Sequence, residues 1–287
     1  MTVIADYPVF SEISMEMRPD LHVRFKALAE GISEFTFANI YLFRGAHNYR
    51  ISRLDGELFV ITGRDAEPFF MLPFGLPDKG AMKSLFAGYG SMKCASESQG
   101  LLLAKMGYSV DEDRDNFDYL YRREDLAGLS GRKLHRKKNL VNFFVRNNSC
   151  QAKPLLDEYL GDAMRILESW RKAQTQPGDY AAAGEALEKT EELQLCGGIF
   201  YVDAEPVAYC LGEELALGTT YAIHFEKAVI RDNYKGVYQF INQSFAAVLP
   251  EKYEMINREQ DLGDIGLRQA KESYRPAGFV KKLRVTA

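Results

Sequence analysis

Residues 195–230 read LCGGIFYVDAEPVAYCLGEELALGTTYAIHFEKAVI, and this stretch decides the fold. It contains three runs rich in apolar, β-branched and aromatic residues, separated by short polar turns. Runs of this length and composition predict three consecutive strands. The following residues predict a loop entering a helix (231–249), a strand (253–259), a second helix (264–274) and a last strand (278–285).

The first half of the chain repeats this order of elements. Its Asp55-Gly56 pair lies between two alternating runs and supplies the positive φ angles that a two-residue hairpin turn needs. The predicted elements are helices at 16–29 and 34–45, strands at 48–54, 57–63 and 67–75, helices near 79–88 and 96–106, and a strand at 116–122.

Both halves also place a Gly-aromatic pair between a helix and a strand, in KMGYSV (105–110) and PAGFVKK (276–282). We therefore predict an α/β fold produced by tandem duplication of one module. The predicted modules are 1–148 and 149–287, with a basic helix at 131–146 where they meet.

The composition predicts a soluble protein. The chain has 287 residues, 46% hydrophobic and 26% charged, with a formal net charge of −4, so any site for a polyanion must be local. No apolar run approaches the roughly 20 residues that cross a bilayer, and the N-terminus lacks the pattern of a signal peptide. The four cysteines and four histidines show no metal-ligand spacing. We expect a cytoplasmic protein without a metal.

Residues 130–144 read SGRKLHRKKNLVNFF and gather positive charge in this acidic chain. The periodicity predicts a helix whose second half is buried between the modules and whose first half projects into solvent. Cations at a helix N-terminus oppose the macrodipole, so a bound polyanion would explain them. Either a tRNA backbone or an anionic lipid surface fits, and the lack of an apolar wedge favours tRNA. The candidate contacts are Arg132, Lys133, Arg136, Lys137 and Lys138.

Two further stretches carry a family resemblance. Residues 229–238 (VIRDNYKGVY) and 270–279 (AKESYRPAGF) resemble the phosphate loop and last helix of the GNAT N-acetyltransferase fold. FSEISMEMRPD, SEFTFANIYLFR, DYLYRREDLAGLSGRKLHRKKN and INREQDLGDIGLRQAKESYRP together resemble the soluble family related to the C-terminal domain of bacterial phosphatidylglycerol lysyltransferases. That family has tandem GNAT modules and is akin to the Fem-type peptidyltransferases. The resemblance implies transfer of an aminoacyl group from aminoacyl-tRNA.

The predicted donor loop departs from the GNAT pattern Arg/Gln-x-x-Gly-x-Gly/Ala. Gly236 is kept, but Asn233 replaces the first residue and Tyr238 the last small one, which would crowd a pyrophosphate. These changes argue against acetyl-CoA and fit either the acceptor end of a charged tRNA or a plain loop. Arg231 and Lys235 remain candidate phosphate contacts.

The candidate catalytic residues lie on or next to the predicted strands and helix of the second module. The resemblance implies that Tyr274 protonates the leaving group. Glu259, at the end of a strand, is the candidate base, and His224 is a second candidate on a neighbouring strand. Arg258, Arg268 and Lys271 are candidate phosphate contacts, although a loop held by salt bridges would contain the same residues.

The sequence therefore predicts an aminoacyltransferase that uses aminoacyl-tRNA, needs no tightly bound cofactor, and acts on a lipid, peptide or small amine. The alternatives are an N-acyltransferase that uses acetyl-CoA and a non-catalytic module that binds RNA or anionic lipid.

Overall fold

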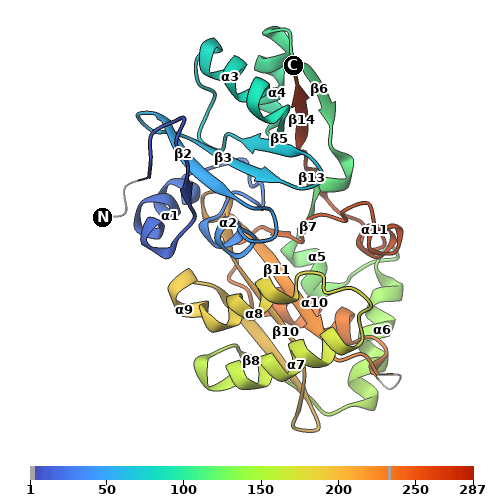
Figure 1. Ribbon diagram of the computed structural model, residues 1–287. Coiled ribbons are helices and arrows are strands. Elements are labelled where there is room, and N and C mark those ends of the chain that lie inside the picture. Colours follow the sequence, from blue (N-terminus) through green and yellow to red (C-terminus); the bar gives the residue numbers. More distant parts are fainter. Residues whose placement is uncertain (1–3, 232–233) are drawn as a thin grey trace.

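Figure 1 shows a computed structural model that describes residues 4–231 and 234–287. These residues form two mixed sheets of seven strands each. In spatial order, the first sheet contains β1 (Ser11–Glu12), β2 (Arg50–Asp55), β3 (Leu58–Arg64), β4 (Pro68–Met71), β5 (Ser91–Ala95), β14 (Leu283–Thr286) and β6 (Ser109–Glu112). The second contains β13 (Gly278–Val280), β7 (Asp118–Arg122), β12 (Met255–Asn257), β11 (Thr220–Ala228), β10 (Glu205–Leu215), β9 (Cys196–Val202) and β8 (Cys150–Pro154).

Helices cover both sheets. They are α1 (Arg18–Lys26), α2 (Phe37–Leu42), α3 (Lys79–Tyr89), α4 (Glu97–Lys105), α5 (Arg123–Gly128), α6 (His135–Asn147), α7 (Leu160–Lys172), α8 (Tyr180–Glu188), α9 (Thr190–Leu193), α10 (Val237–Val248) and α11 (Ile265–Glu272). Single 3₁₀ turns lie at Met15–Met17, Arg114–Asn116, Asp157–Tyr159 and Ala216–Gly218. Within the described ranges, no helix combines the length and apolar character needed to cross a membrane.

The two sheets repeat one arrangement, as the sequence predicts. In each, an antiparallel meander (β2-β3-β4 or β9-β10-β11) leads into a helix and then into a strand parallel to the last one, β5 or β12. A second helix and an edge strand, β6 or β13, complete each repeat. The expected meander at 195–230 is therefore confirmed as β9, β10 and β11.

The sheets also exchange strands. β7 follows the first repeat in sequence but lies in the second sheet between β12 and β13, whereas β14 follows the second repeat and lies between β5 and β6. Figure 1 shows β14, in red, beside β5 and β6. The predicted single strand at 278–285 is wrong, because it divides into β13 and β14 in different sheets. The module boundary at 148/149 remains a prediction. The two sheets do not divide the sequence at that point, because β7 lies in the second sheet and β14 in the first.

A buried ion pair lies where the two exchanged segments cross. Lys282, between β13 and β14, has a fully buried side chain whose Nζ lies 2.6 Å from Asp118 Oδ1 at the start of β7. Glu34 also pairs with Lys282. The Asp113 N–H donates to the Lys282 carbonyl at 2.9 Å, so a backbone hydrogen bond joins the two crossing segments directly. A cation with no access to water needs such partners, and Asp118 and Glu34 supply them at the point where the final strand divides.

The core continues across both halves, with Phe43 before β2 stacked on Phe225 of β11 at a ring-centroid distance of 6.2 Å. The expected basic helix at 131–146 is α6, which begins at His135 and packs on α10. Its second half is not buried on all sides as predicted: Val141 and Phe144 are buried, but Phe143 is 49% exposed. A helix packed along one side hides only one stripe of residues.

Candidate functional site

The loop after β12 is shaped by its first residues. Glu259 has a φ of +54°, in the left-handed region that a residue with a Cβ adopts at a cost. The Asn257 side chain offsets that cost, because its Oδ1 accepts a hydrogen bond from the Glu259 N–H at 2.8 Å. This turn directs the Glu259 carboxylate back toward β11.

His224 on β11 lies between two carboxylates. Its Nδ1 is 2.7 Å from Glu259 Oε1 and its Nε2 is 3.1 Å from Glu213 Oε1 on β10. The His224 side chain is 1% exposed. Burial alone would lower the pKa of the imidazole, but the hydrogen bonds to Glu213 and Glu259 outweigh burial and raise it to about 10. The Glu213–His224–Glu259 triad therefore contains an imidazolium at neutral pH.

This protonation state changes the expected role of His224. An imidazolium donates from both nitrogens and has no lone pair with which to accept a proton. His224 is thus poorly suited to the role of base and well suited to hold the Glu259 carboxylate in place. Between the two candidates, the geometry favours Glu259.

A second cluster surrounds Tyr274, directly after α11. The Arg258 guanidinium lies 5.2 Å from the Tyr274 ring centroid and donates to Glu226 Oε2 at 2.9 Å. Asn242 of α10 donates to Glu226 Oε1 at 2.7 Å. Tyr274 is 5% exposed, and burial raises the pKa of its hydroxyl to about 12.

Three buried polar atoms in this cluster have no hydrogen-bond partner among the described residues: Tyr274 Oη, Arg258 Nη1 and Asn242 Oδ1. Buried donors and acceptors are normally paired, so a group of unpaired ones is a feature of binding sites. The cluster could donate two hydrogen bonds and accept one from a bound molecule.

The basic start of α6 adjoins this cluster. Lys137 Nζ lies 4.2 Å from the Tyr274 ring centroid, and burial and the Arg258 charge both lower its pKa. Four neighbouring cations have no ion pair or side-chain hydrogen bond within residues 4–231 and 234–287: Arg132, Lys133, Arg136 and Lys138. All four are exposed, two of them just before α6 and two in its first turn. We name these four residues the α6 basic patch.

The basic stripe predicted on α11 is instead tied into the fold. Arg268 pairs with Asp261 at 2.7 Å and Asp115 at 2.6 Å. Lys271 donates to the Arg258 carbonyl at 2.6 Å and to the two carbonyls that follow it. Burial, followed by the charge of Arg258, lowers the pKa of Lys271 to about 8. These contacts hold the loop after β12, and a phosphate contact by Arg268 or Lys271 stays a prediction.

The predicted donor loop is only partly described, because Asn233 lies outside the described residues. Gly236 caps α10 with a φ of +99°, and a Cβ at this position would lie 2.4 Å from the Leu140 carbonyl oxygen of α6. The glycine therefore allows two helices to approach closely, and backbone occupies the space beside it. Arg231 and Lys235 are exposed.

Glu213 and Asn242 were not selected from the sequence. A signal for each was present: Glu213 is a charged residue in a largely apolar strand, and Asn242 lies on the apolar face of a helix. Buried polar residues of this kind are retained when they have partners or a ligand.

Comparisons with known proteins agree with this architecture. The sequence model of the family described as "Phosphatidylglycerol lysyltransferase, C-terminal" matches residues 25–285. A conserved protein of unknown function from Bacteroides thetaiotaomicron VPI-5482 has a crystal structure with 27% identity and a TM-score of 0.85, covering 96% of this chain and 98% of its own. An uncharacterized protein from Mycoplasmoides gallisepticum is 23% identical over 184 residues, 61% of this chain. The aligned part spans 57% of that relative's length.

Two more distant structures show the fold alone. L-PGS from Bacillus licheniformis is 13% identical, with a TM-score of 0.62 over 99% of this chain and 94% of its own. A tandem GNAT protein from the clavulanic acid biosynthesis pathway is 10% identical, with a TM-score of 0.51 over 97% of both chains. The fold is the predicted tandem GNAT-like fold.

Proposed function

The chain belongs to the family of the phosphatidylglycerol lysyltransferase C-terminal domain, and from this premise we propose that it transfers an aminoacyl group from aminoacyl-tRNA to an acceptor amine or hydroxyl. One observation carries the proposal: Lys137, at the basic start of α6, lies against Tyr274. A polyanion on the α6 basic patch would therefore end beside a buried hydroxyl that lacks a partner.

The proposed chemistry uses two proton transfers. The acceptor nitrogen or oxygen attacks the ester carbonyl, and Glu259 takes the proton that the acceptor releases. The bond from the carbonyl carbon to the ribose oxygen breaks, and Tyr274 gives its hydroxyl proton to that oxygen. Both side chains then return to their starting states by proton exchange with water. Tyr274 suits this role because its hydroxyl has no hydrogen-bond partner among the described residues and is free to donate to the leaving oxygen.

Binding of tRNA is the first test. We expect fluorescent bulk tRNA to bind with an affinity that falls steeply with salt, and the triple variant Arg136→Glu/Lys137→Glu/Lys138→Glu to lose that binding. Each phosphate contact removed lowers the slope of log K against log salt by about 0.7–0.9. A matched control reverses three exposed lysines on helices α3 and α4, Lys79, Lys83 and Lys105, and should bind as the wild type does.

Lack of tRNA binding by the wild type at low salt would overturn the proposal. Vesicles containing anionic lipid would then test the lipid-binding alternative, and a thermal shift with acetyl-CoA would test the N-acyltransferase alternative. The close contact between Gly236 and Leu140 counts against acetyl-CoA, because it fills the space beside the N-terminus of α10.

Catalysis needs its own measurement. Total tRNA charged with labelled amino acids should lose label faster when the protein and a mixture of amines and lipid vesicles are added. We expect Tyr274→Phe and Glu259→Gln to slow this loss by about 10²–10⁴-fold. Tyr274→Phe removes only a hydroxyl without a partner, so its unfolding midpoint should match the wild type. Binding of tRNA with no rate in any variant would indicate a non-catalytic module.

A further inference from the structure

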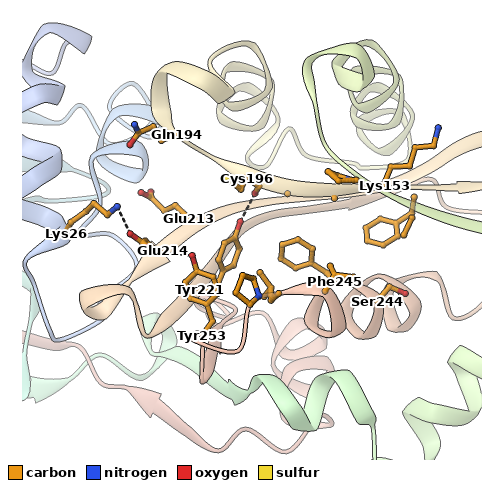
Figure 2. Close-up of a pocket in the computed structure, with 18 of the residues that line it drawn as sticks. Lys26, Lys153, Gln194, Cys196, Glu213, Glu214, Tyr221, Ser244, Phe245 and Tyr253 are labelled. Carbon is orange, nitrogen blue, oxygen red and sulfur yellow. Dashed lines mark hydrogen bonds and ion pairs between the residues drawn. The ribbon is translucent and has the colours of Figure 1, made fainter.

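A separate cavity lies between the second sheet and the first half of the chain. Its volume is about 480 Å³, within the range of small-molecule sites. Figure 2 shows it bounded by strands β9, β10 and β11 and by the C-terminal half of α10. The residues that line it are mainly apolar or aromatic and include Tyr221, Phe245, Val248 and Tyr253.

Two adjacent glutamates with different ion-pair partners lie at the polar end of this cavity. Glu214 is neutralised twice, by Lys26 at 2.5 Å and by Lys252 at 2.9 Å. Glu213 is 6% exposed, and in the described part of the chain its only side-chain partner is His224, through Oε1. Figure 2 shows both glutamates at the end of the cavity nearest Lys26.

One carboxylate oxygen of Glu213, in the Glu213–His224–Glu259 triad, has no partner within the described ranges. Glu213 contacts His224 through Oε1, and Glu213 Oε2 makes no hydrogen bond to another described residue. A ligand ammonium that donates to Glu213 Oε2 would supply that partner. The nearby aromatic rings of Tyr221 and Tyr253 also favour an organic cation.

We propose that this cavity binds a hydrophobic primary amine. The ammonium group pairs with Glu213, and the apolar body lies among Tyr221, Phe245 and Val248. Carboxylic acids and alcohols of the same length cannot form an ion pair with Glu213. This site does not depend on the proposed transferase function, because binding needs neither tRNA nor turnover.

Occupancy of the cavity should reach the loop after β12. An ammonium that pairs with Glu213 competes with His224 Nε2 for the same carboxylate. His224 would then interact more strongly with Glu259, its other partner, at 2.7 Å. The imidazole of His224 should therefore respond to ligands in the cavity, although Glu213 is the triad member that lines the cavity and His224 does not.

Calorimetry with three probes of equal length tests the proposal. We expect n-octylamine to bind the wild type saturably at neutral pH, and n-octanol and octanoate to bind at least about tenfold more weakly. Addition of octylamine should also shift the His224 side-chain nitrogen resonances. Equal or tighter binding of octanol or octanoate would overturn the proposal, as would the absence of saturable octylamine binding.

Variants locate the site. Glu213→Gln keeps the shape of the side chain and should weaken octylamine binding by about tenfold or more. Glu251→Gln, an exposed position outside the cavity lining, is the matched control and should bind normally. Because Glu213→Gln could disturb the fold, Val248→Ser provides a second variant at a lining residue that is 74% exposed. Unchanged octylamine binding in both cavity variants would place the amine elsewhere and refute the site.

Discussion

Two charge-rich stretches of this chain look alike in sequence and differ in structure. Between 257 and 272, Arg258, Glu259, Asp261, Arg268 and Lys271 each contact another described group of opposite charge or a backbone carbonyl. The α6 basic patch has no such partners within the described ranges. The first stretch uses charge to hold a loop, and the second presents charge to solvent. A dense run of ionisable residues therefore indicates a binding surface only where its charges lack partners.

The largest expected difference between the stretches concerns Asp261. Its side chain is fully buried and accepts hydrogen bonds from Arg268, Tyr119 and the Gly263 N–H. We expect Asp261→Asn to lower the free energy of unfolding by about 3 kcal/mol, because an amide replaces the charged acceptor of the buried hydrogen bonds from Tyr119 and Gly263 and of the partly exposed Arg268. Urea denaturation at pH 7 measures this change.

The matched control is Glu272→Gln. The Glu272 side chain is 51% exposed and pairs with Arg114, which also pairs with Asp261. It should change stability by less than about 1 kcal/mol. Burial opposes ionisation of Asp261, but its hydrogen bonds outweigh burial and hold its pKa well below the usual range. Its stabilisation is thus present at neutral pH and is lost as the pH falls through that depressed pKa. Equal losses of unfolding free energy in Asp261→Asn and Glu272→Gln would contradict the expected difference between the buried and the exposed carboxylate.

An intermediate effect is expected from His224. Its folded-state pKa of about 10 lies above that of an unfolded histidine, so its stabilisation is complete below about pH 6.5 and is lost as the pH rises toward 10. Between pH 7 and 9 the wild type should lose on the order of 2 kcal/mol relative to His224→Gln. Urea denaturation of both proteins at pH 7, 8 and 9 measures the difference. Parallel curves would mean that His224 is not held as an imidazolium.

The smallest effect has the opposite sign. Arg136 is exposed in the first turn of α6, where a positive charge opposes the helix macrodipole. We expect Arg136→Glu to stabilise the protein by about 0.3–1 kcal/mol while weakening tRNA binding. Arg146→Glu, in the last turn of the same helix, should destabilise by a similar amount. Thermal unfolding measures both, and a loss of stability at Arg136 would show that its charge has a structural partner.

Much of this fold could be predicted from local patterns. Alternating apolar runs and the Asp55-Gly56 turn identify β2, β3 and the meander β9-β10-β11, because hairpins join neighbours in sequence. The exchange of β7 and β14 could not be predicted in this way. It pairs Val285 with Met92, and no periodicity within a short window records a partner so distant.

Some residues of the candidate site could likewise be selected from the sequence, and others could not. His224, Glu259 and Tyr274 could be selected from their positions in a repeated fold, and the structure places His224 beside Glu259. For Glu213 the only signal was a charged residue in a largely apolar strand, because its role depends on a contact between two strands and on a cavity lined in part by α1. Arg268 was selected by its charge, and its ion pair with the distant residue Asp115 could not be predicted from the sequence.

The exchange of strands also governs how the chain becomes folded while it is made. β6 pairs only with β14 in the described sheet, and β14 ends at residue 286 of 287. The ribosome must therefore translate the entire second repeat before β6 gains its neighbour, whereas β7 emerges before the sheet that it joins. Throughout that interval the nascent chain carries the unpaired edge of β5, which is a surface that chaperones cover and that other nascent chains can join.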